Sequence, residues 1–324
     1  MSQRPTGAAH DVSVVIPFYN GGATLQRAVA SIEAQTLSPG EIVIVDDGSP
    51  TPLPVLQSGR VPVRVLRHEQ NRGIPGARNA GIAAAQGRLL AFLDQDDEWA
   101  PDKLERQLAA HAATPDAVVF GRLRHRGEVA REWSWPPDAA VQPLEQGGDA
   151  ALRALIRWGN AVPFVTLLVP RRVFETSGPL DERLRGGADD YEFVLRLVAE
   201  GVSLRFDGAG AAGWSAVHHY TGANYSAHAP RWLRDDFELI DRLAARYPLI
   251  AARADEARAR FHYTMGRHHD GAGDRAEARR HYEQAVRLAP LWLRPRVARA
   301  WLRLPGPVAR ATDRLARRVG LLRG

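Results

Sequence analysis

Short apolar runs alternate with segments of helical periodicity along the first third of the chain. Compact runs rich in Val, Ile and Leu, typical of buried strands, lie at residues 12–17, 41–45, 61–66 and 89–93. Between them, apolar positions recur at helical spacing after Thr24, the expected N-cap, and small residues fill 77–85. Strands that alternate with helices predict a parallel sheet with right-handed crossovers, so we expect a Rossmann-like α/β half.

The pattern is less regular after Pro115. Strands are indicated at residues 117–124 and 202–206, helices at 150–158 and 191–199, and a further apolar run at 164–169. Residues 171–174 are expected to open a loop. The Trp-rich residues 133–135 are compatible with core, a ligand platform or an interface.

From about Trp232 onward the sequence is helical. Small, aromatic and proline positions follow the spacing of a tetratricopeptide repeat at Gly266, Ala278, Tyr282, Ala285 and Pro290. One such unit cannot form a solenoid, so we expect an αα-hairpin docked on the α/β domain or on a partner.

We therefore expect two regions. The first is an α/β domain over residues 1–230, with one half at 11–115 and the other at 116–230. The second is a helical region over residues 231–324 that ends in a basic amphipathic tail.

The composition, 45% hydrophobic and 25% charged residues, is ordinary for a globular protein. The absence of cysteine excludes disulfides, a thiolate nucleophile and a zinc–thiolate site. Residues 1–10 lack an apolar leader, and no apolar run approaches the length of a membrane span. These features predict a cytoplasmic protein.

Positive charge is concentrated at the end of the chain. From Arg294 onward there are nine arginines and one aspartate, a net charge of +8, whereas the whole chain carries +6. Interleaved apolar residues favour an anionic membrane surface over nucleic acid, and so peripheral attachment at the inner face of the membrane. The alternative is a solvated face of a packed helix.

Acidic residues follow the apolar runs where the expected strands end. Asp94, Asp96 and Asp97 come directly after residues 89–93, and Asp46 and Asp47 after 41–45. The carboxyl edge of an open α/β sheet is where ligands bind, and clustered carboxylates suit Mg²⁺ or Mn²⁺. The alternative for the first group is a solvated turn that caps a helix near Pro101, and Asp97 is expected to be such a cap.

An ordered set of motifs resembles the family 2 glycosyltransferases of GT-A fold. The resemblance is dense over the first third of the chain and sparse to about Ser226. Its motifs are Val14-Ile16-Pro17-Tyr19-Asn20, Val45-Asp46-Asp47-Gly48-Ser49, Asn71-Arg72-Gly73 with Ala77-Arg78-Asn79-Gly81, and Phe92-Leu93-Asp94-Gln95-Asp96-Asp97 with Trp99 and Pro101. It implies a mostly parallel central sheet with flanking helices, followed here by the helical region. The half at 11–115 would hold the nucleotide-sugar, and the half at 116–230 would supply the acceptor site.

The resemblance also implies how the donor is bound. Asp96 would be the ligand of Mn²⁺ or Mg²⁺, and Asp94 would lie near the ribose or a bound water. Asp47 would read the base, beside Asp46. The base pocket would be lined by Pro17 and Tyr19, and Arg78 would stand beside the nucleotide or Asp96. The alternative for the Asp46-Asp47 pair is a structural Asx-turn.

The same resemblance implies a catalytic base. Asp190, near the start of a helix, would deprotonate the acceptor hydroxyl in a single displacement that inverts the anomeric centre. Asp189, a candidate nucleotide-sugar-binding residue, stands where the family usually has Glu. Because its side chain is shorter, its support of the site is less certain. The alternative is that both acids only cap the helix.

Histidine departs from the family pattern. The segment Gly222 to Ser226 is preceded by Thr221 where a His is common, and His218 and His219 lie slightly upstream. Either could reach the metal if the loop is shifted, with His219 the candidate ligand. The processive Gln-x-x-Arg-Trp signature is not found in this region.

These observations predict a metal-dependent inverting glycosyltransferase. It would move one sugar from a nucleotide-diphosphate sugar, with UDP the expected nucleotide, to a glycan or lipid-linked acceptor in cell-surface polysaccharide synthesis. The alternatives are an inactive binding or scaffold protein and a sugar-nucleotide nucleotidyltransferase. The latter usually needs a basic loop after the first strand, and residues 18–23 contain no basic residue.

Overall fold

The computed structural model describes residues 11–56, 59–127, 133–185, 187–210, 212–220 and 229–302. The chain forms two compact units. One contains residues 1–155 and 159–227, and the other contains residues 156–158 and 228–324.

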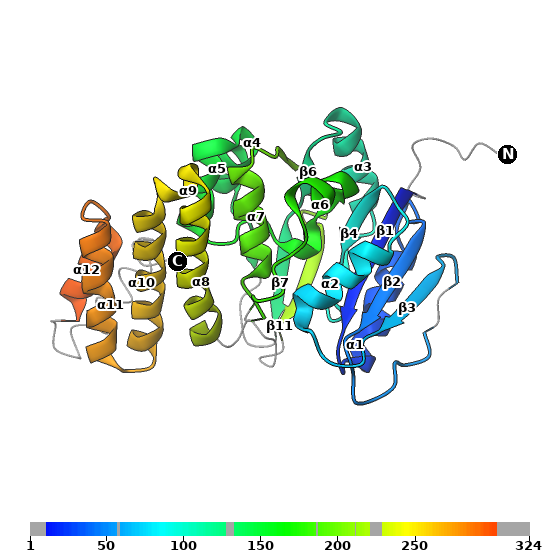
Figure 1. Ribbon diagram of the computed structural model, residues 1–324, viewed down its shortest axis with the longest axis horizontal. Coiled ribbons are helices and arrows are strands. Elements are labelled where there is room, and N and C mark those ends of the chain that lie inside the picture. The colour runs from blue at the N-terminus through cyan, green and yellow to red at the C-terminus, as the bar shows by residue number, and fades with distance from the viewer. Residues whose placement is uncertain are drawn as a thin grey trace. The chain divides into compact units, whose positions relative to one another are not determined.

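A seven-stranded sheet is the centre of the first unit (Figure 1), with strand order β10-β6-β9-β4-β1-β2-β3. Its strands are β1 Val12–Phe18, β2 Glu41–Asp46, β3 Val63–Arg67, β4 Leu89–Phe92, β6 Val118–Phe120, β9 Leu168–Pro170 and β10 Leu204–Phe206. Strands β3, β2, β1 and β4 are parallel, which confirms the expectation for the first half. Strand β9 runs antiparallel to both of its neighbours, β4 and β6.

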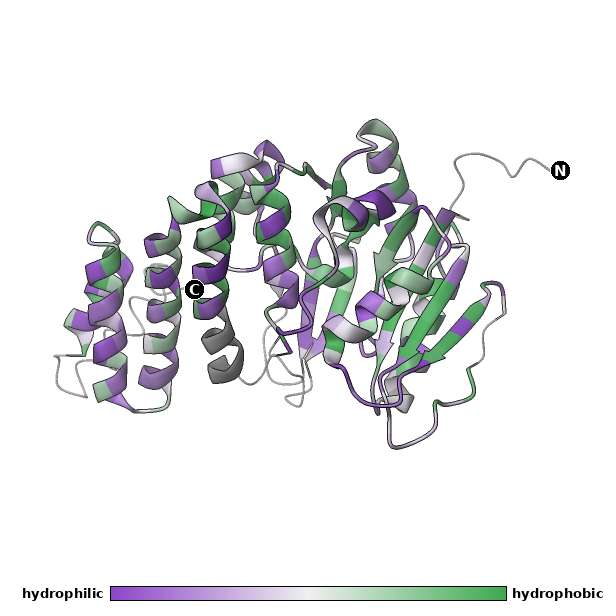
Figure 2. Ribbon diagram, in the orientation of Figure 1, coloured by the Kyte–Doolittle hydropathy of each residue, from purple (hydrophilic) through white to green (hydrophobic). Residues whose placement is uncertain are grey.

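Helices cover both faces of the parallel strands. The helices of this unit are α1 Gly22–Glu33, α2 Gly73–Ala84, α3 Lys103–Ala113, α4 Asp138–Gln146, α5 Gly148–Trp158 as far as Leu155, α6 Arg171–Ser177 and α7 Asp189–Ala199. Val14 and Ile16 pack with Leu25 of α1 in the main core cluster. A Cβ at Gly81 of α2 would lie 2.3 Å from Val15, whose side chain points to the opposite face. Both faces of β1 are therefore buried, in keeping with its mostly apolar sequence. Figure 2 shows the hydrophobic residues of this sheet.

Three local expectations were wrong. Residues 171–177 form helix α6 rather than a loop. The expected strand at 117–124 is broken, and Gly121 lies at the break, where a Cβ would be 2.2 Å from the Ser215 hydroxyl. Thr24 is not an N-cap, because α1 begins at Gly22 and the Thr24 hydroxyl donates to the Gly21 carbonyl.

A second sheet has the order β5-β11-β7-β8. Its strands are β5 Glu98–Trp99, β7 Leu123–Gly127, β8 Trp133–Trp135 and β11 Ala216–Tyr220. Strand β11 is parallel to β7 and antiparallel to β5, and β8 is antiparallel to β7.

The second unit is helical in its described part. Its helices are α8 Ala229–Arg246, α9 Pro248–Ala251, α10 Ala254–Gly271, α11 Arg275–Leu288 and α12 Leu293–Trp301. Helices α10 and α11 form the expected hairpin around buried Tyr263 and Tyr282. Gly266 lets the helices approach, because a Cβ there would lie 2.5 Å from the Tyr282 ring.

Candidate active site at the carboxyl edge of the sheet

Arg78 of α2 connects the acids after β4 with the acids at the start of α7. Its Nη2 donates to Asp94 Oδ1 and its Nη1 to Asp189 Oδ2, each at 2.9 Å. The guanidinium lies 4.2 Å from the centre of the Phe164 ring, and Arg78 is only 4% exposed. Arg78 thus lies between Asp94 and Asp189, and its expected place beside the nucleotide or Asp96 stays a prediction.

Burial and the neighbouring charges act in opposite directions on the pKa values of Arg78 and of Asp189. Burial alone would lower the pKa of Arg78, but the charges of Asp94, Asp189 and Asp190 outweigh it and raise that pKa. Burial raises the pKa of Asp189, against the influence of the Arg78 charge. Although its side chain is short, Asp189 reaches the buried guanidinium of Arg78.

Asp190 lies beside this pair, in the first turn of α7. Its Oδ1 accepts a 2.7 Å hydrogen bond from the Tyr191 amide. Burial, together with the neighbouring charge of Asp189, raises the pKa of Asp190 to about 7. A carboxylate with that pKa can take up a proton near neutral pH, as a general base must.

Asp96 follows β4 in the loop that also holds Asp94. Burial raises the pKa of Asp96, and the negative charge of nearby Asp94 raises it further, because the two carboxylates repel each other. Arg27 of α1 donates to the Asp96 carbonyl at 2.7 Å and so fixes the backbone of the loop. A bound divalent cation would relieve the repulsion between the two acids.

The donor set fits Mg²⁺ or Mn²⁺ that completes its shell with other oxygens. Within the described ranges, no three or more His, Asp or Glu side chains are grouped so that they could hold a metal themselves. Mg²⁺ characteristically takes one or two carboxylates and fills its remaining positions with substrate phosphates and water. Asp96 with Asp94 nearby meets that requirement.

The two histidines of β11 point to different acids. His218 Nδ1 lies 3.0 Å from Asp97 Oδ1, and His219 Nε2 lies 2.6 Å from Glu98 Oε1. Asp97 is therefore not the helix cap we expected, because its carboxylate is buried against His218 and α3 begins only at Lys103. The expected segment Gly222 to Ser226, with Thr221, lies outside the described residues.

The acids after β2 are engaged with the protein. Asp46, the last residue of β2, accepts from the Ser49 amide at 2.9 Å and pairs with Arg67 at 2.6 Å. Asp47 accepts from the Arg72 and Gly73 amides at 2.9 and 2.8 Å. Asp47 therefore ties the loop before α2 to the end of β2.

Gln95 is a site residue that the sequence did not identify. Its Oε1 accepts from the Tyr19 amide at 2.8 Å, and its Nε2 donates to the Tyr19 carbonyl at 3.2 Å. The side chain of Tyr19 is 49% exposed, whereas Pro17 is buried within β1. The middle residue of an Asp-x-Asp pattern carries no signal of its own, so only the fold reveals that Gln95 joins the two loops.

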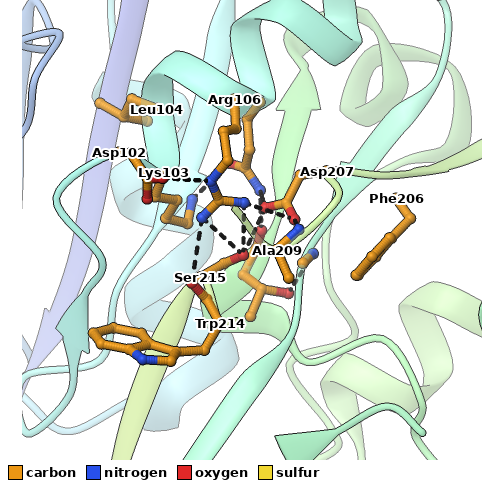
Figure 3. A network of polar contacts seen from close by, with 12 residues as sticks. Asp102, Lys103, Leu104, Arg106, Phe206, Asp207, Ala209, Trp214 and Ser215 are labelled. Carbon is orange, nitrogen blue, oxygen red and sulfur yellow. Dashed lines mark hydrogen bonds and ion pairs between the residues drawn. The ribbon is translucent and has the colours of Figure 1, made fainter. Parts of the chain in front are cut away.

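A buried polar network supports the start of β11 (Figure 3). Asp207 pairs with Arg106 of α3 at 2.9 Å and accepts from the Ser215 hydroxyl at 2.6 Å. Lys103 donates to Gln107 at 2.7 Å, and its burial lowers its pKa to about 7. Because Ser215 directly precedes Ala216, the network fixes the strand that carries His218.

The mostly parallel sheet and the acids at its carboxyl edge define an α/β protein of GT-A fold. Residues 13–167 match the sequence profile of Glycosyl transferase family 2. The chain therefore carries a family 2 glycosyltransferase domain, as the motifs predicted.

Two curated relatives illustrate the similarity. The succinoglycan biosynthesis protein ExoO of Rhizobium meliloti is 45% identical over 198 residues, which cover 59% of this chain and 56% of that protein. The UDP-Glc:alpha-D-GlcNAc-diphosphoundecaprenol beta-1,3-glucosyltransferase WfgD of Escherichia coli is 37% identical over 112 residues, 34% of this chain and 44% of that protein. The chain thus spans about half the length of these relatives.

Solved structures show the same fold. TarS 1–349 of S. aureus in complex with UDP-GlcNAc superposes with a TM-score of 0.62 and 17% identity, covering 93% of this chain and 88% of that one. The structure of the same fragment with UDP gives a TM-score of 0.56 at 18% identity.

Proposed function

We propose that this protein is an inverting glycosyltransferase that moves one sugar from a nucleotide-diphosphate sugar to an acceptor hydroxyl. The observation that carries the proposal is the buried Arg78, which holds the donor-side acid Asp94 and the acid Asp189 beside Asp190 in one constellation. That constellation places an ionisable carboxylate next to the loop where the diphosphate would be bound.

Asp190 would perform the proton chemistry. Its carboxylate takes the proton of the acceptor hydroxyl while that oxygen forms a bond to the anomeric carbon. The bond between this carbon and the diphosphate oxygen breaks, and the nucleoside diphosphate leaves with the electron pair. Attack opposite to the leaving group inverts the configuration.

Asp96, with Asp94, would hold Mg²⁺ or Mn²⁺. When bound, the cation supplies positive charge that neutralises the departing diphosphate. In the protein itself, Arg27 fixes the backbone of this loop, and Gln95 joins the loop to Tyr19.

We propose a uridine nucleotide as the donor nucleotide and a glycan or lipid-linked saccharide as the acceptor. Two names support this: WfgD is described as using UDP-Glc and a diphosphoundecaprenol-linked sugar, and the TarS fragment was solved with UDP-GlcNAc. The name of ExoO, a succinoglycan biosynthesis protein, supports a role in polysaccharide synthesis. Pro17, Tyr19, Asp46 and Asp47 remain the candidates for the base pocket.

We also propose that the basic tail binds an anionic membrane surface at the cytoplasmic face. Its charge supports the proposal, and most of the tail lies outside the described residues. No helix in the described ranges is long and apolar enough to cross a membrane.

Replacing Asp190 by Asn tests the base assignment. We expect sugar transfer to fall by about 10² to 10⁴-fold, because the general base is lost. UDP binding with Mg²⁺, measured by calorimetry, should stay unchanged, since the amide keeps the size of the side chain.

Asp149→Asn is the matched control, because Asp149 is an exposed acid in the first turn of α5. Normal transfer by Asp190→Asn would remove the base assignment. Absence of both nucleotide and metal binding in the unaltered protein would instead favour an inactive scaffold.

A further inference from the structure

One face of the second sheet carries a row of aromatic rings across three strands. His218 of β11 is paired in register with His125 of β7, and His125 with Trp133 of β8. The His218 and His125 rings meet edge to face at 5.4 Å. The His125 and Trp133 rings are stacked at 4.5 Å with an interplanar angle of 9°.

The row begins at the candidate active site. His218 contacts Asp97, which directly follows the proposed metal ligand Asp96. Trp133, at the other end, is therefore separated from Asp97 by the side chains of His125 and His218. Fixed strand pairing sets that separation.

Trp133 is open to solvent, whereas Trp135 is partly buried. Trp135, on the same face of β8, donates its indole N–H to the Asn160 carbonyl at 2.8 Å and is partly buried. Trp133 is 45% exposed although His125 covers one side of its ring. His125 thus supports one side of the Trp133 indole, and part of the apolar surface of the ring stays uncovered.

We propose that Trp133 is the platform for the acceptor sugar, with a pyranose ring stacked on its exposed indole. The inference rests on the proposed function, because it assigns the acceptor side of the same site. An aromatic ring offers a flat apolar face to the C–H side of a pyranose, while the sugar hydroxyls stay hydrated at the ring edge.

The surroundings favour a sugar over a protein partner. In the described part of this sheet, Trp133 is the single large apolar side chain that is markedly exposed, and the adjacent Ser134 is exposed and polar. A specific protein interface buries about 1,000 Å² or more, whereas one supported ring is enough for one sugar residue.

The test uses the full-length protein and a panel of octyl glycosides (glucoside, galactoside and N-acetylglucosaminide) with a UDP-sugar and Mg²⁺. We expect Trp133→Ala to raise KM for the accepted glycoside by about ten-fold, with KM for the UDP-sugar unchanged. Trp133→Tyr keeps a flat ring and should stay within about three-fold of the unaltered protein. Val65→Ala, which shortens an exposed side chain on the edge strand β3, is the matched control.

Binding can be followed independently of turnover. Fluorine NMR of the protein labelled with 5-fluorotryptophan identifies the Trp133 signal as the one missing in Trp133→Tyr. We expect that signal to shift as a glycoside is added in the presence of UDP and Mg²⁺. An unchanged acceptor KM in Trp133→Ala, or a Trp133 signal that no glycoside of the panel shifts, overturns the proposal. Failure to bind UDP at all would instead remove the proposed function.

Discussion

Arg78 brings together two acids that are far apart in the sequence. Asp94 is partly exposed, with 32% of its side chain accessible, whereas Asp189 is 3% exposed on the same measure. The two ion pairs are therefore unequal in energy. A buried carboxylate that loses its cation has neither water nor another charge to replace it.

We expect Arg78→Met to lower the free energy of unfolding by about 3 kcal/mol, because it leaves Asp189 buried and uncompensated. The double variant Arg78→Met/Asp189→Asn should regain part of that loss, since the unpaired charge is removed. Chemical denaturation of the two variants and of Asp189→Asn alone measures the coupling. Additive losses would contradict a buried ion pair.

The pKa of Asp190 predicts how transfer depends on pH. A base with a pKa raised to about 7 is largely protonated, and so inactive, at lower pH. We expect kcat/KM to rise about ten-fold per unit below pH 7 and to level off above it. A profile that stays flat from pH 5.5 to 8.5, at saturating Mg²⁺, would show that another group takes the proton.

The sequence predicted the residues of this site better than their contacts. Asp94, Asp96, Asp189 and Asp190 carry a motif signal, because each follows a strand or opens a helix at a fixed place in an ordered set. Their roles toward donor and acceptor stay predictions. The pairing of Asp97 with His218 depends on β11 lying beside β5, which no local pattern reveals.

At the level of elements, the close approach of α10 and α11 depends on Gly266. The site of a Cβ there is occupied by the Tyr282 ring, whereas a Cβ at Gly271, near the end of the same helix, would meet nothing. We expect Gly266→Ala to lower the free energy of unfolding by about 1 to 3 kcal/mol through overpacking.

Gly271→Ala is the matched control, because it makes the same chemical change without a clash. Hydrogen exchange of the α11 amides should accelerate in Gly266→Ala only. Equal exchange in both variants would show that the hairpin can separate slightly without cost.

Compact apolar runs and long helical periods predicted elements more reliably than short mixed patterns. The parallel strands β1 to β4 follow compact apolar runs, even the four-residue β4, and the αα-hairpin carries a long, consistent pattern. The run at 164–169 divides into a single 3₁₀ turn and the three-residue strand β9, and no pattern of that length determines strand direction. Helix α6 was missed because its seven residues are too few for a clear period.

For the whole molecule, the uneven charge predicts salt-sensitive membrane binding. Residues 303–324 contain six arginines and one aspartate. A chain truncated after Leu302 keeps α12 and should co-sediment less with anionic vesicles at low salt, where screening is weak.

Replacing Arg279 and Arg280 of α11 by Gln removes two other exposed charges and serves as the control. The expected difference should disappear at high salt. Equal co-sedimentation of the truncated and complete chains at low salt would contradict a role of the tail in binding.

Strand β9 has a consequence for how the protein is made. It pairs with β4, which precedes it by a long stretch of sequence, and it separates β4 from β6. A ribosome synthesises β1 to β4 first, so the apolar strand Leu89–Phe92 is an unpaired sheet edge until residues 168–170 emerge. Nascent chains that stop before residue 168 should therefore aggregate, and chains that include β9 should not.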